Sequence, residues 1–181
     1  MKDAAPPADP DPVASRFGPL ARDMLERGPL MPAWRLSFLA NAYTGPLYAA
    51  VATGFGLSRP DFVILLCLSR QDGLVARDVA RLSGLPKNSL SRAVGGLVAR
   101  GLVSSDIGGE DRRARPLRLT EEGRALLARV VPLFEARQAA MLAPLDAGER
   151  ERFLALLGKL IHGAAGWVDG NDRPAAARPR S

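Results

Sequence analysis

The most regular spacing of apolar and polar residues in the chain lies between residues 88 and 100. Apolar side chains recur there at intervals of three and four, so they share one stripe of a helix. This stripe consists of Leu90, Ala93, Val94, Leu97 and Val98. The opposite stripe consists of Asn88, Ser91, Arg92, Gly95, Gly96 and Ala99. It carries hydrogen-bonding groups at its start and little bulk after them. The pattern predicts a helix that buries one face and offers the other to a partner surface.

The segments on either side of this helix complete a recognisable motif. A short amphipathic run, 78–83, precedes it and is separated from it by the break Gly84-Leu85-Pro86. Two strand-like pieces follow, near Val103 and over 117–119, and an arginine-rich loop joins them. Leu74-Val75 is expected as a short strand beside them. A helix, a turn with glycine, a second helix and a basic hairpin predict a winged helix-turn-helix.

Longer apolar helices flank this motif. The segment 32–55 is largely apolar, and Pro46 is expected to kink its helix. The segment 62–70 is apolar nearly all round, so we place its helix at the centre of the module, with Ser58 as its cap. A short helix is expected within 16–28. Together these elements predict a mainly α fold with a small β-wing.

Two helices follow the wing. Thr120 is the expected cap of the first, a long helix that Pro132 should interrupt. Asp146 and Glu149 have the spacing of a capping box at the start of the second. These helices, and those before the motif, expose more apolar surface than one small domain can bury, which indicates a partner chain.

The chain therefore divides into five expected segments. Residues 1–14 form a disordered N-terminal tail, because Pro, Ala and Asp leave almost nothing to bury. Residues 15–57 hold N-terminal dimerisation helices, and residues 58–120 form the DNA-binding module. Residues 121–166 hold C-terminal dimerisation helices, and residues 167–181 form a flexible tail.

Charge supports a nucleic-acid partner. The net charge is +6, and it is concentrated between Arg70 and Thr120, where ten Lys and Arg face five Asp and Glu. The single cysteine, Cys67, excludes an intrachain disulfide and favours a reducing compartment. The chain shows no signal peptide and no apolar run of membrane length, so we expect a cytoplasmic protein.

The motif resembles the MarR family of bacterial transcriptional regulators. In the helix-turn-helix, the matching residues are Leu85, Ser89, Ser91, Arg92, Leu97, Gly101, Leu102 and Val103. In the wing, they are Asp111, Arg112 and Arg113, a D-R-R signature, followed by Leu117, Leu119, Thr120 and Gly123. The resemblance covers roughly residues 32–163. It implies a homodimer, a pseudo-palindromic DNA operator, and a repressor released by a small ligand.

The candidate DNA contacts fall into two groups. Asn88, Ser91 and Arg92 are the candidates for base edges, because Asn and Arg can bond adenine and guanine at two points. The candidates for phosphate or minor-groove contact are Lys87, Ser89, Arg112, Arg113 and Arg115. By resemblance, Asp111 orients a wing arginine through a salt bridge.

One position departs from the family pattern. The family usually places Ser, Asp or Thr directly after the leucine that corresponds to Leu85, and this chain has Pro86 there. Proline supplies no capping oxygen, so Asn88 or Ser89 becomes the expected cap of the recognition helix.

Regulation can be interpreted in several ways. By resemblance, a small aromatic or phenolic acid would bind in a cleft lined by Trp34, Phe38, Asn41 and Phe62. The same four residues can also be ordinary core and interface residues. Cys67 could sense oxidants, although a thiol within an apolar helix usually behaves as a small hydrophobe. His162, near the end of the last helix, suits a helix-dipole partner rather than a catalytic base.

Other classes of protein are less well supported by the sequence. The chain has no HExxH, no glycine-rich phosphate loop and no CxxC metal spacing, so we expect neither an enzyme nor a bound cofactor or metal. A winged-helix protein-interaction module without DNA binding stays an alternative, because of Pro86 and the Gly95-Gly96 pair.

Overall fold

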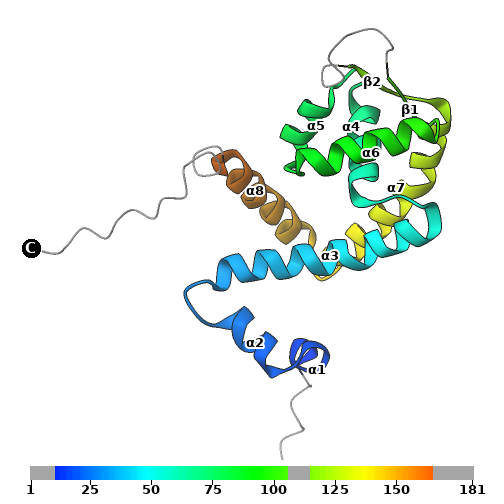
Figure 1. The fold of residues 1–181 in the computed structure, drawn as a ribbon. Coiled ribbons are helices and arrows are strands. Elements are labelled where there is room, and N and C mark those ends of the chain that lie inside the picture. The colour runs from blue at the N-terminus through cyan, green and yellow to red at the C-terminus, as the bar shows by residue number, and fades with distance from the viewer. Residues whose placement is uncertain (1–10, 106–114, 165–181) are drawn as a thin grey trace, which may run out of the picture. The chain divides into compact units, whose positions relative to one another are not determined.

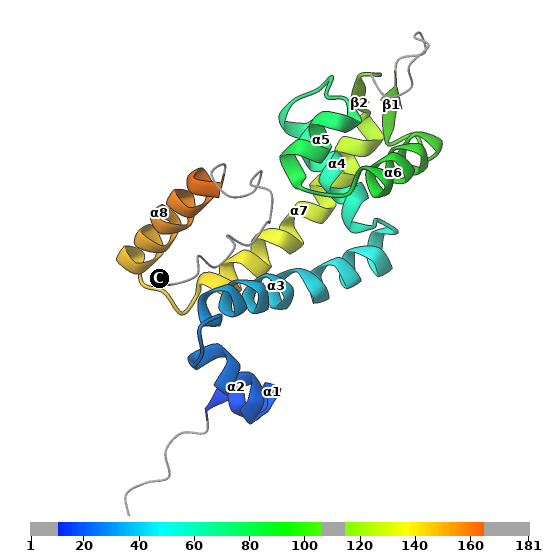
Figure 2. The same cartoon turned by 60° about the vertical axis from the view of Figure 1, so that its left-hand side comes forward.

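Helices dominate the computed structural model, which describes residues 11–105 and 115–164 (Figures 1 and 2). The elements are α1 Pro12–Phe17, α2 Pro19–Glu26, α3 Met31–Phe55, α4 Arg59–Arg70, α5 Ala76–Ser83, α6 Lys87–Ala99, β1 Val103–Ser105, β2 Leu117–Leu119, α7 Glu121–Leu142 and α8 Ala147–Gly163. The predicted fold class, mainly α with a small β-wing, is confirmed. The chain forms two compact units, Met1–Arg137 and Gln138–Ser181.

Helix α4 supplies the centre of the first unit, as its sequence predicted. Its start is fixed by a capping box in which the Ser58 and Asp61 side chains bond each other's backbone N–H groups. Its buried residues are Phe62, Ile64, Leu65 and Leu68. Side chains from α3, α5, α6, both strands and α7 complete the same apolar cluster, so α4 holds the helix-turn-helix to the rest of the unit.

Helices α5 and α6 form the helix-turn-helix, and α6 lies across α4 (Figure 1). Gly84 ends α5 with φ +66°, a left-handed conformation that favours glycine. Leu90, Ala93 and Leu97 are buried, so α6 packs with the predicted face inward. Val98, at the edge of the stripe, is 39% exposed, and its predicted burial was wrong.

The predicted cap of α6 was also wrong. The helix begins at Lys87, with Pro86 as its N-cap residue and no side-chain capping bond. Asn88 and Ser89 lie inside the first turn, where their side chains cannot cap the helix. The Pro86 carbonyl accepts from the N–H groups of Ser89 and Leu90, at 3.0 and 3.2 Å. Proline fits this position because its fixed φ suits the entry to a helix.

Strands β1 and β2 form the base of the wing. They pair antiparallel, with Val103 opposite Leu119 and Ser105 opposite Leu117. Leu74 forms only an isolated bridge to Leu117, so the predicted strand at Leu74-Val75 is reduced to a single pair. Residues 106–114, between the strands, lie outside the described residues.

Helix α7 leaves the wing through a tight contact. Thr120 caps it, as predicted, by accepting from the Gly123 N–H at 3.0 Å. A Cβ at Gly123 would overlap the Leu102 carbonyl oxygen and lie 2.8 Å from Leu119 Cδ1. Glycine is therefore required here because the helix start lies directly against the β1–β2 pair.

Two helices continue through an internal proline. Pro46 has no N–H for the Ala42 carbonyl, yet α3 remains one helix. Arg137 compensates from α7, because its guanidinium donates to the carbonyls of Ala42 and Tyr43. Helix α7 likewise contains Pro132 without a break, so the interruption predicted there was wrong.

The N-terminal segment is more ordered than its composition indicated. Helix α1 begins at Pro12, inside the predicted tail 1–14, and Asp11 caps it by accepting from the Val13 N–H at 2.8 Å. The short helix expected within 16–28 is α2, and Gly18, at φ +86°, separates it from α1. The ring of Phe17 contacts the ring of Phe38 edge-on, with centroids 5.0 Å apart, which attaches the pair to α3.

Helix α8 belongs to the second unit and begins with the predicted capping box between Asp146 and Glu149. None of its residues is buried within the chain. Its large exposed hydrophobic residues are Leu154, Leu156, Leu160 and Ile161. Taken by itself, α8 therefore has an uncovered apolar surface. Of the expected C-terminal tail, residues 167–181, none lies among the described residues.

Within the described ranges, no single helix is both long and apolar enough to cross a membrane. By length and composition, the bent pair α3 and α4, with 86° between the two helices, meets that test together.

Candidate nucleic-acid interface

The outward face of α6 carries the predicted base-contacting residues. Asn88, Ser91 and Arg92 are all exposed, and Lys87 is exposed beside them, whereas Ser89 is partly buried. Arg92 Nε lies 3.4 Å from the Asn88 carbonyl oxygen, one turn earlier. The Arg92 guanidinium therefore stays on the surface of the helix, above the same turn as Asn88, and can be reached from outside.

The same face lacks bulk further along. A Cβ at Gly95 or Gly96 would meet no atom within 4 Å, so nothing inside the described fold requires glycine at either position. Each glycine costs about 1 kcal/mol of helix stability relative to alanine. These two bare positions leave the α6 backbone open to close approach by another surface.

The base of the wing is held to α4 and α7 by polar contacts that the sequence did not reveal. Asp72, after α4, accepts from the Leu119 N–H at 3.0 Å. Arg124 of α7 lies 3.2 Å from the other Asp72 carboxylate oxygen and donates to the Leu119 carbonyl at 3.4 Å. The Gly73 N–H also bonds the Leu117 carbonyl, at 2.9 Å. Strand β2 is thereby fixed relative to the helix-turn-helix.

The predicted wing contacts are described only in part. Asp111, Arg112 and Arg113 lie outside the described residues. Arg115 lies at the start of the returning chain and is partly buried. Arg118 follows on β2, on the exposed side of the strand. The wing therefore brings cationic residues to the edge of the module at which the strands pair.

Not every arginine near the motif faces outward for a partner. Arg100 donates to the carbonyl oxygens of Gly56, at 2.8 Å, and Phe55, at 3.3 Å, at the end of α3. Its role is structural, although it counts toward the basic charge of the segment.

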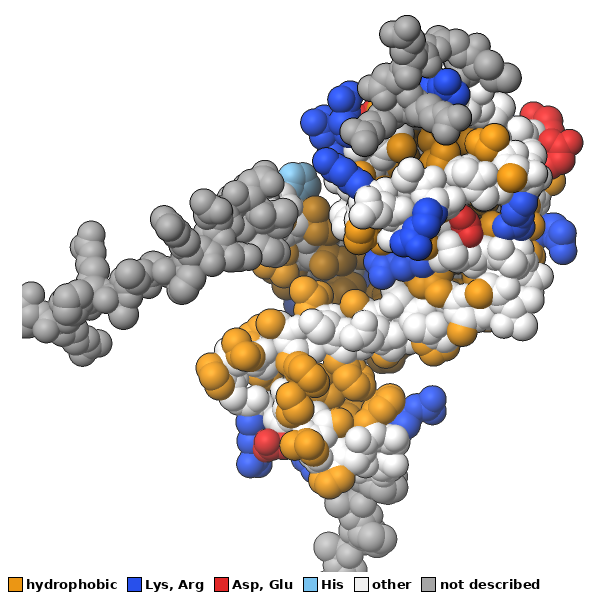
Figure 3. Space-filling model, in the orientation of Figure 1, with side chains coloured by type: hydrophobic (Ala, Val, Ile, Leu, Met, Phe, Trp, Pro, Cys, Tyr) orange, Lys and Arg blue, Asp and Glu red, His pale blue; other side chains and the backbone are white. Residues whose placement is uncertain are grey.

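Sequence reasoning missed Arg77 and Arg81, which are one turn apart on α5 and line a hollow with Lys87. On the face shown in Figure 3, cationic side chains gather around α5 and α6.

Three of the four residues proposed to line an effector cleft lie on α3, at helical spacing, and the fourth lies on α4. Phe62 is only 4% exposed and stacks on Phe134, with ring centroids 3.9 Å apart. Trp34 is 42% exposed, and Asn41 is also exposed, while Phe38 packs against Phe17. Phe62 thus behaves as a core residue, and a shared cleft stays a prediction for the other three.

Cys67 and His162 lie in different surroundings. Cys67 is partly buried within α4, and burial raises the pKa of its thiol, which lowers the fraction of reactive thiolate at neutral pH. His162 is exposed in the last turn of α8, where Nδ1 lies 2.7 Å from the Gly158 carbonyl oxygen. No cluster of His, Cys, Asp and Glu suited to a metal occurs among the described residues.

Comparison with known proteins gives the family. The sequence model of the MarR family matches residues 55–114. The HTH-type transcriptional repressor Rv2887 of Mycobacterium tuberculosis is 30% identical over 129 residues, which cover 71% of this chain and 93% of that protein. The chain belongs to the MarR family. The match includes the helix-turn-helix and the segment that contains the D-R-R signature.

Solved structures agree with this assignment. A MarR-family regulator from Silicibacter pomeroyi is 31% identical, with a TM-score of 0.64 over 72% of this chain and 87% of that one. Rv2887 in complex with DNA is 30% identical, with a TM-score of 0.59 over 74% of this chain and 98% of that one. Rv2887 has also been solved with salicylic acid, and that structure is 29% identical with the same TM-score over 75% of this chain and 98% of that one.

The Cys67 environment yields a testable expectation. Because the thiolate is the reactive form and burial raises the thiol pKa, iodoacetamide should alkylate Cys67 more slowly than free cysteine at pH 7. The rate should rise with pH and reach half its maximum at a higher pH than for free cysteine. Mass spectrometry of samples quenched across a pH series measures both. Alkylation faster than free cysteine at pH 7 would instead favour the redox-sensing alternative.

Proposed function

We propose that this MarR-family protein is a dimeric, sequence-specific DNA-binding repressor. The observation that carries the proposal is the orientation of α6, whose apolar stripe is buried while Asn88, Ser91 and Arg92 are exposed. Such a helix fits the major groove with its polar face toward the base edges. A relative that shares 30% of its residues, Rv2887, has been solved with DNA. The proposed regulator acts in the cytoplasm, where a bacterial chromosome lies.

The homodimer in this proposal is supported by apolar surface that one chain leaves open. On α3, Leu36 and Leu39 are exposed, and α8 has a similar set of exposed leucines. Apolar surface of this extent usually marks an interface. A two-fold dimer would place two copies of α6 in successive major grooves, about 10 bp apart, so the operator should be pseudo-palindromic.

The contacts within this interface have different proposed tasks. Asn88, Ser91 and Arg92 would read bases, whereas Lys87 and Ser89 would contact phosphates. The bare stretch at Gly95 and Gly96 would let the sugar-phosphate backbone approach α6. In the wing, Arg112, Arg113 and Arg115 would reach phosphates or the minor groove, with Asp111 orienting one of the wing arginines.

We further propose that a small aromatic acid releases the DNA. Rv2887 has been solved with salicylic acid and with p-aminosalicylic acid, and a Bordetella bronchiseptica regulator that is 25% identical has been described with 6-hydroxynicotinic acid. All three ligands join an aromatic ring to a carboxylate. Exposed Trp34 and Asn41, with Phe38 nearby on α3, are the proposed contacts in the dimer.

Replacing single arginines tests the DNA proposal. Arg92→Ala should lose about 1–3 kcal/mol of discrimination at one base position, because a bidentate bond to guanine disappears. Arg113→Ala should weaken binding to all sequences and make the slope of log K against log salt shallower by about 0.9 for each phosphate that the variant no longer neutralises. Fluorescence titrations with a selected site and a shuffled site, at several salt concentrations, measure both effects. The DNA proposal fails if the wild type shows no preference between the two sites.

Replacing glycines separates stability from DNA binding. Gly96→Ala should raise the free energy of unfolding by about 1 kcal/mol, because the Cβ meets open space on an exposed helix face. It should nevertheless weaken DNA binding, because the backbone can no longer approach as closely. Gly54→Ala near the end of α3 is the control, since Gly54 is exposed and a Cβ there also meets nothing within 4 Å. Urea unfolding and DNA titration of both variants give the comparison, and unchanged DNA affinity in Gly96→Ala would refute the close-approach argument.

Adding salicylate tests the effector proposal. Saturating salicylate should weaken operator binding by about 5- to 150-fold, the usual range of coupling between two sites. Acetate at the same ionic strength is the control, because it has the carboxylate without the ring. Gel-shift titrations with each acid measure the difference. If acetate and salicylate weaken binding equally, the effect is ionic and the aromatic effector proposal is wrong.

A further inference from the structure

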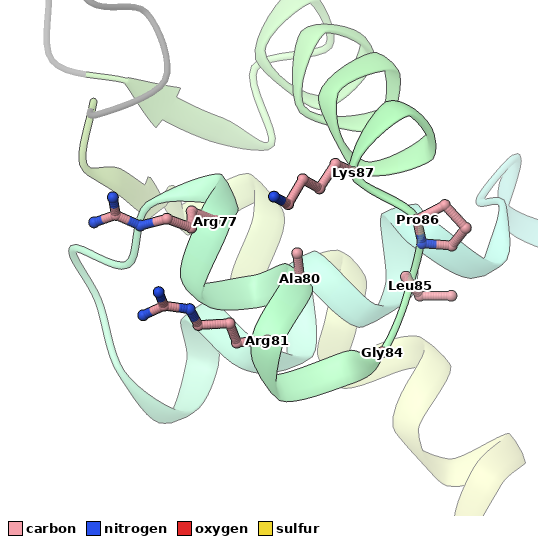
Figure 4. A pocket seen from close by; sticks show the side chains of 7 residues that line it. All are labelled: Arg77, Ala80, Arg81, Gly84, Leu85, Pro86 and Lys87. Atoms are coloured by element: carbon pink, nitrogen blue, oxygen red, sulfur yellow. The ribbon is translucent and has the colours of Figure 1, made fainter. Parts of the chain in front are cut away.

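A cationic hollow lies between α5 and α6, outside the contacts proposed above except for Lys87. It has a volume of about 360 Å³ and is lined by Arg77, Ala80, Arg81, Gly84, Leu85, Pro86 and Lys87. In Figure 4, the side chains of Arg77 and Arg81 extend to one side from successive turns of α5, and Lys87 extends toward that side from the start of α6. Ala80 lies between them and adds little bulk.

Among the residues that the structure describes, no acidic side chain neutralises the charges around this hollow. None of the residues that line it is acidic. Among the described residues, no acidic side chain forms an ion pair with Arg77, Arg81 or Lys87. Asp78 is the neighbouring acid on α5, and its carboxylate accepts from the Val75 N–H at the helix start. Within the described part of the chain, the three cations thus have no anionic partner.

The start of α6 adds hydrogen-bond donors to the same place. Because Pro86 provides no capping side chain, the N–H groups of Lys87 and Asn88 have no acceptor among the described residues. The positive end of the helix dipole lies at this point as well. A tetrahedral anion with several acceptor oxygens matches this combination, since guanidinium groups and free N–H groups bind such oxygens well.

We propose that this hollow binds a phosphate of the DNA backbone, with Arg77 and Arg81 as positioning residues. The proposal rests on the proposed DNA-binding function and extends it to α5. The hollow is continuous with the proposed DNA-contacting face of α6, because Lys87 lines the hollow and directly precedes Asn88 on that face. A duplex that meets Asn88 and Arg92 in its major groove presents its backbone at the start of the helix. The phosphate would fix the depth and register of α6 without reading sequence.

Charge removal on α5 tests the proposal. Arg77→Gln and Arg81→Gln should each weaken binding to selected and shuffled sites by the same factor, because phosphates carry no sequence information. If a variant leaves one phosphate without its cation, its slope of log K against log salt should be shallower by about 0.9. The affinity of the variant relative to the wild type should therefore fall about eightfold for each tenfold decrease in salt concentration. Arg27→Gln on α2 is the charge-matched control, since Arg27 is paired with Asp23 at 3.7 Å. It should change neither the affinity nor the slope.

The outcomes separate three possibilities. A wild type without DNA binding refutes the proposed function itself. A wild type that binds, with Arg77→Gln and Arg81→Gln both matching Arg27→Gln in affinity and slope, refutes the phosphate clamp alone. Calorimetric titration with inorganic phosphate tests whether the hollow binds free phosphate rather than a phosphate of DNA. If the α5 variants lose binding of inorganic phosphate but keep full DNA affinity, the hollow holds a free anion, and its assignment to DNA is overturned.

Discussion

The burial of one stripe of α6 is the constraint on which the proposed DNA-facing surface depends. Leu90 and Leu97 are almost fully buried, and each contributes about 1.5–3 kcal/mol relative to an exposed side chain. Rotating the helix by one residue, about 100°, would expose them and turn Arg92 toward the core. Desolvating an unpaired guanidinium costs several kcal/mol more. Apolar packing therefore fixes which residues of α6 can meet a partner.

Besides apolar packing, arginine side chains connect the elements around this helix by donating to backbone carbonyls. Arg100 ties the end of α6 to the last carbonyls of α3, Arg124 joins α7 to β2, and Arg137 bonds the carbonyls of α3 next to Pro46. Each binds backbone oxygens that a helix end, a strand end or a proline leaves available. Part of the basic composition of the chain thus serves the fold itself, because these three arginines hold its elements together.

The sequence predicted those features that depend on local periodicity and local capping. The apolar stripe of α6, the central position of α4 and the caps at Ser58, Thr120 and Asp146 were all recoverable, because each signal lies within a few residues of its effect. Features that depend on tertiary contacts were not. Helix α7 continues through Pro132 without the expected interruption, and nothing local predicts that Arg137 donates to α3 beside Pro46.

In the candidate site too, features set by local spacing were predictable, and features set by tertiary contacts were not. The exposure of Asn88, Ser91 and Arg92 followed from helical spacing alone. Phe62 is buried, as expected for the core alternative, but nothing local indicates that Phe134 stacks on it from another helix. Arg77 and Arg81 were overlooked, although their spacing of four residues on α5 already placed them on one face. Only the fold reveals that Lys87 joins them across the turn.

The free protein tolerates two local costs at that hollow. Like charges four residues apart on a helix destabilise it by about 0.2–0.5 kcal/mol, and a helix start without a capping side chain forgoes about 1 kcal/mol. Among the described residues, no acidic side chain forms an ion pair with these cations. An anion bound between α5 and α6 would relieve both, because it screens the repulsion and accepts from the free N–H groups. The relief would appear only in the bound state, so it would contribute to affinity rather than to the stability of the free fold.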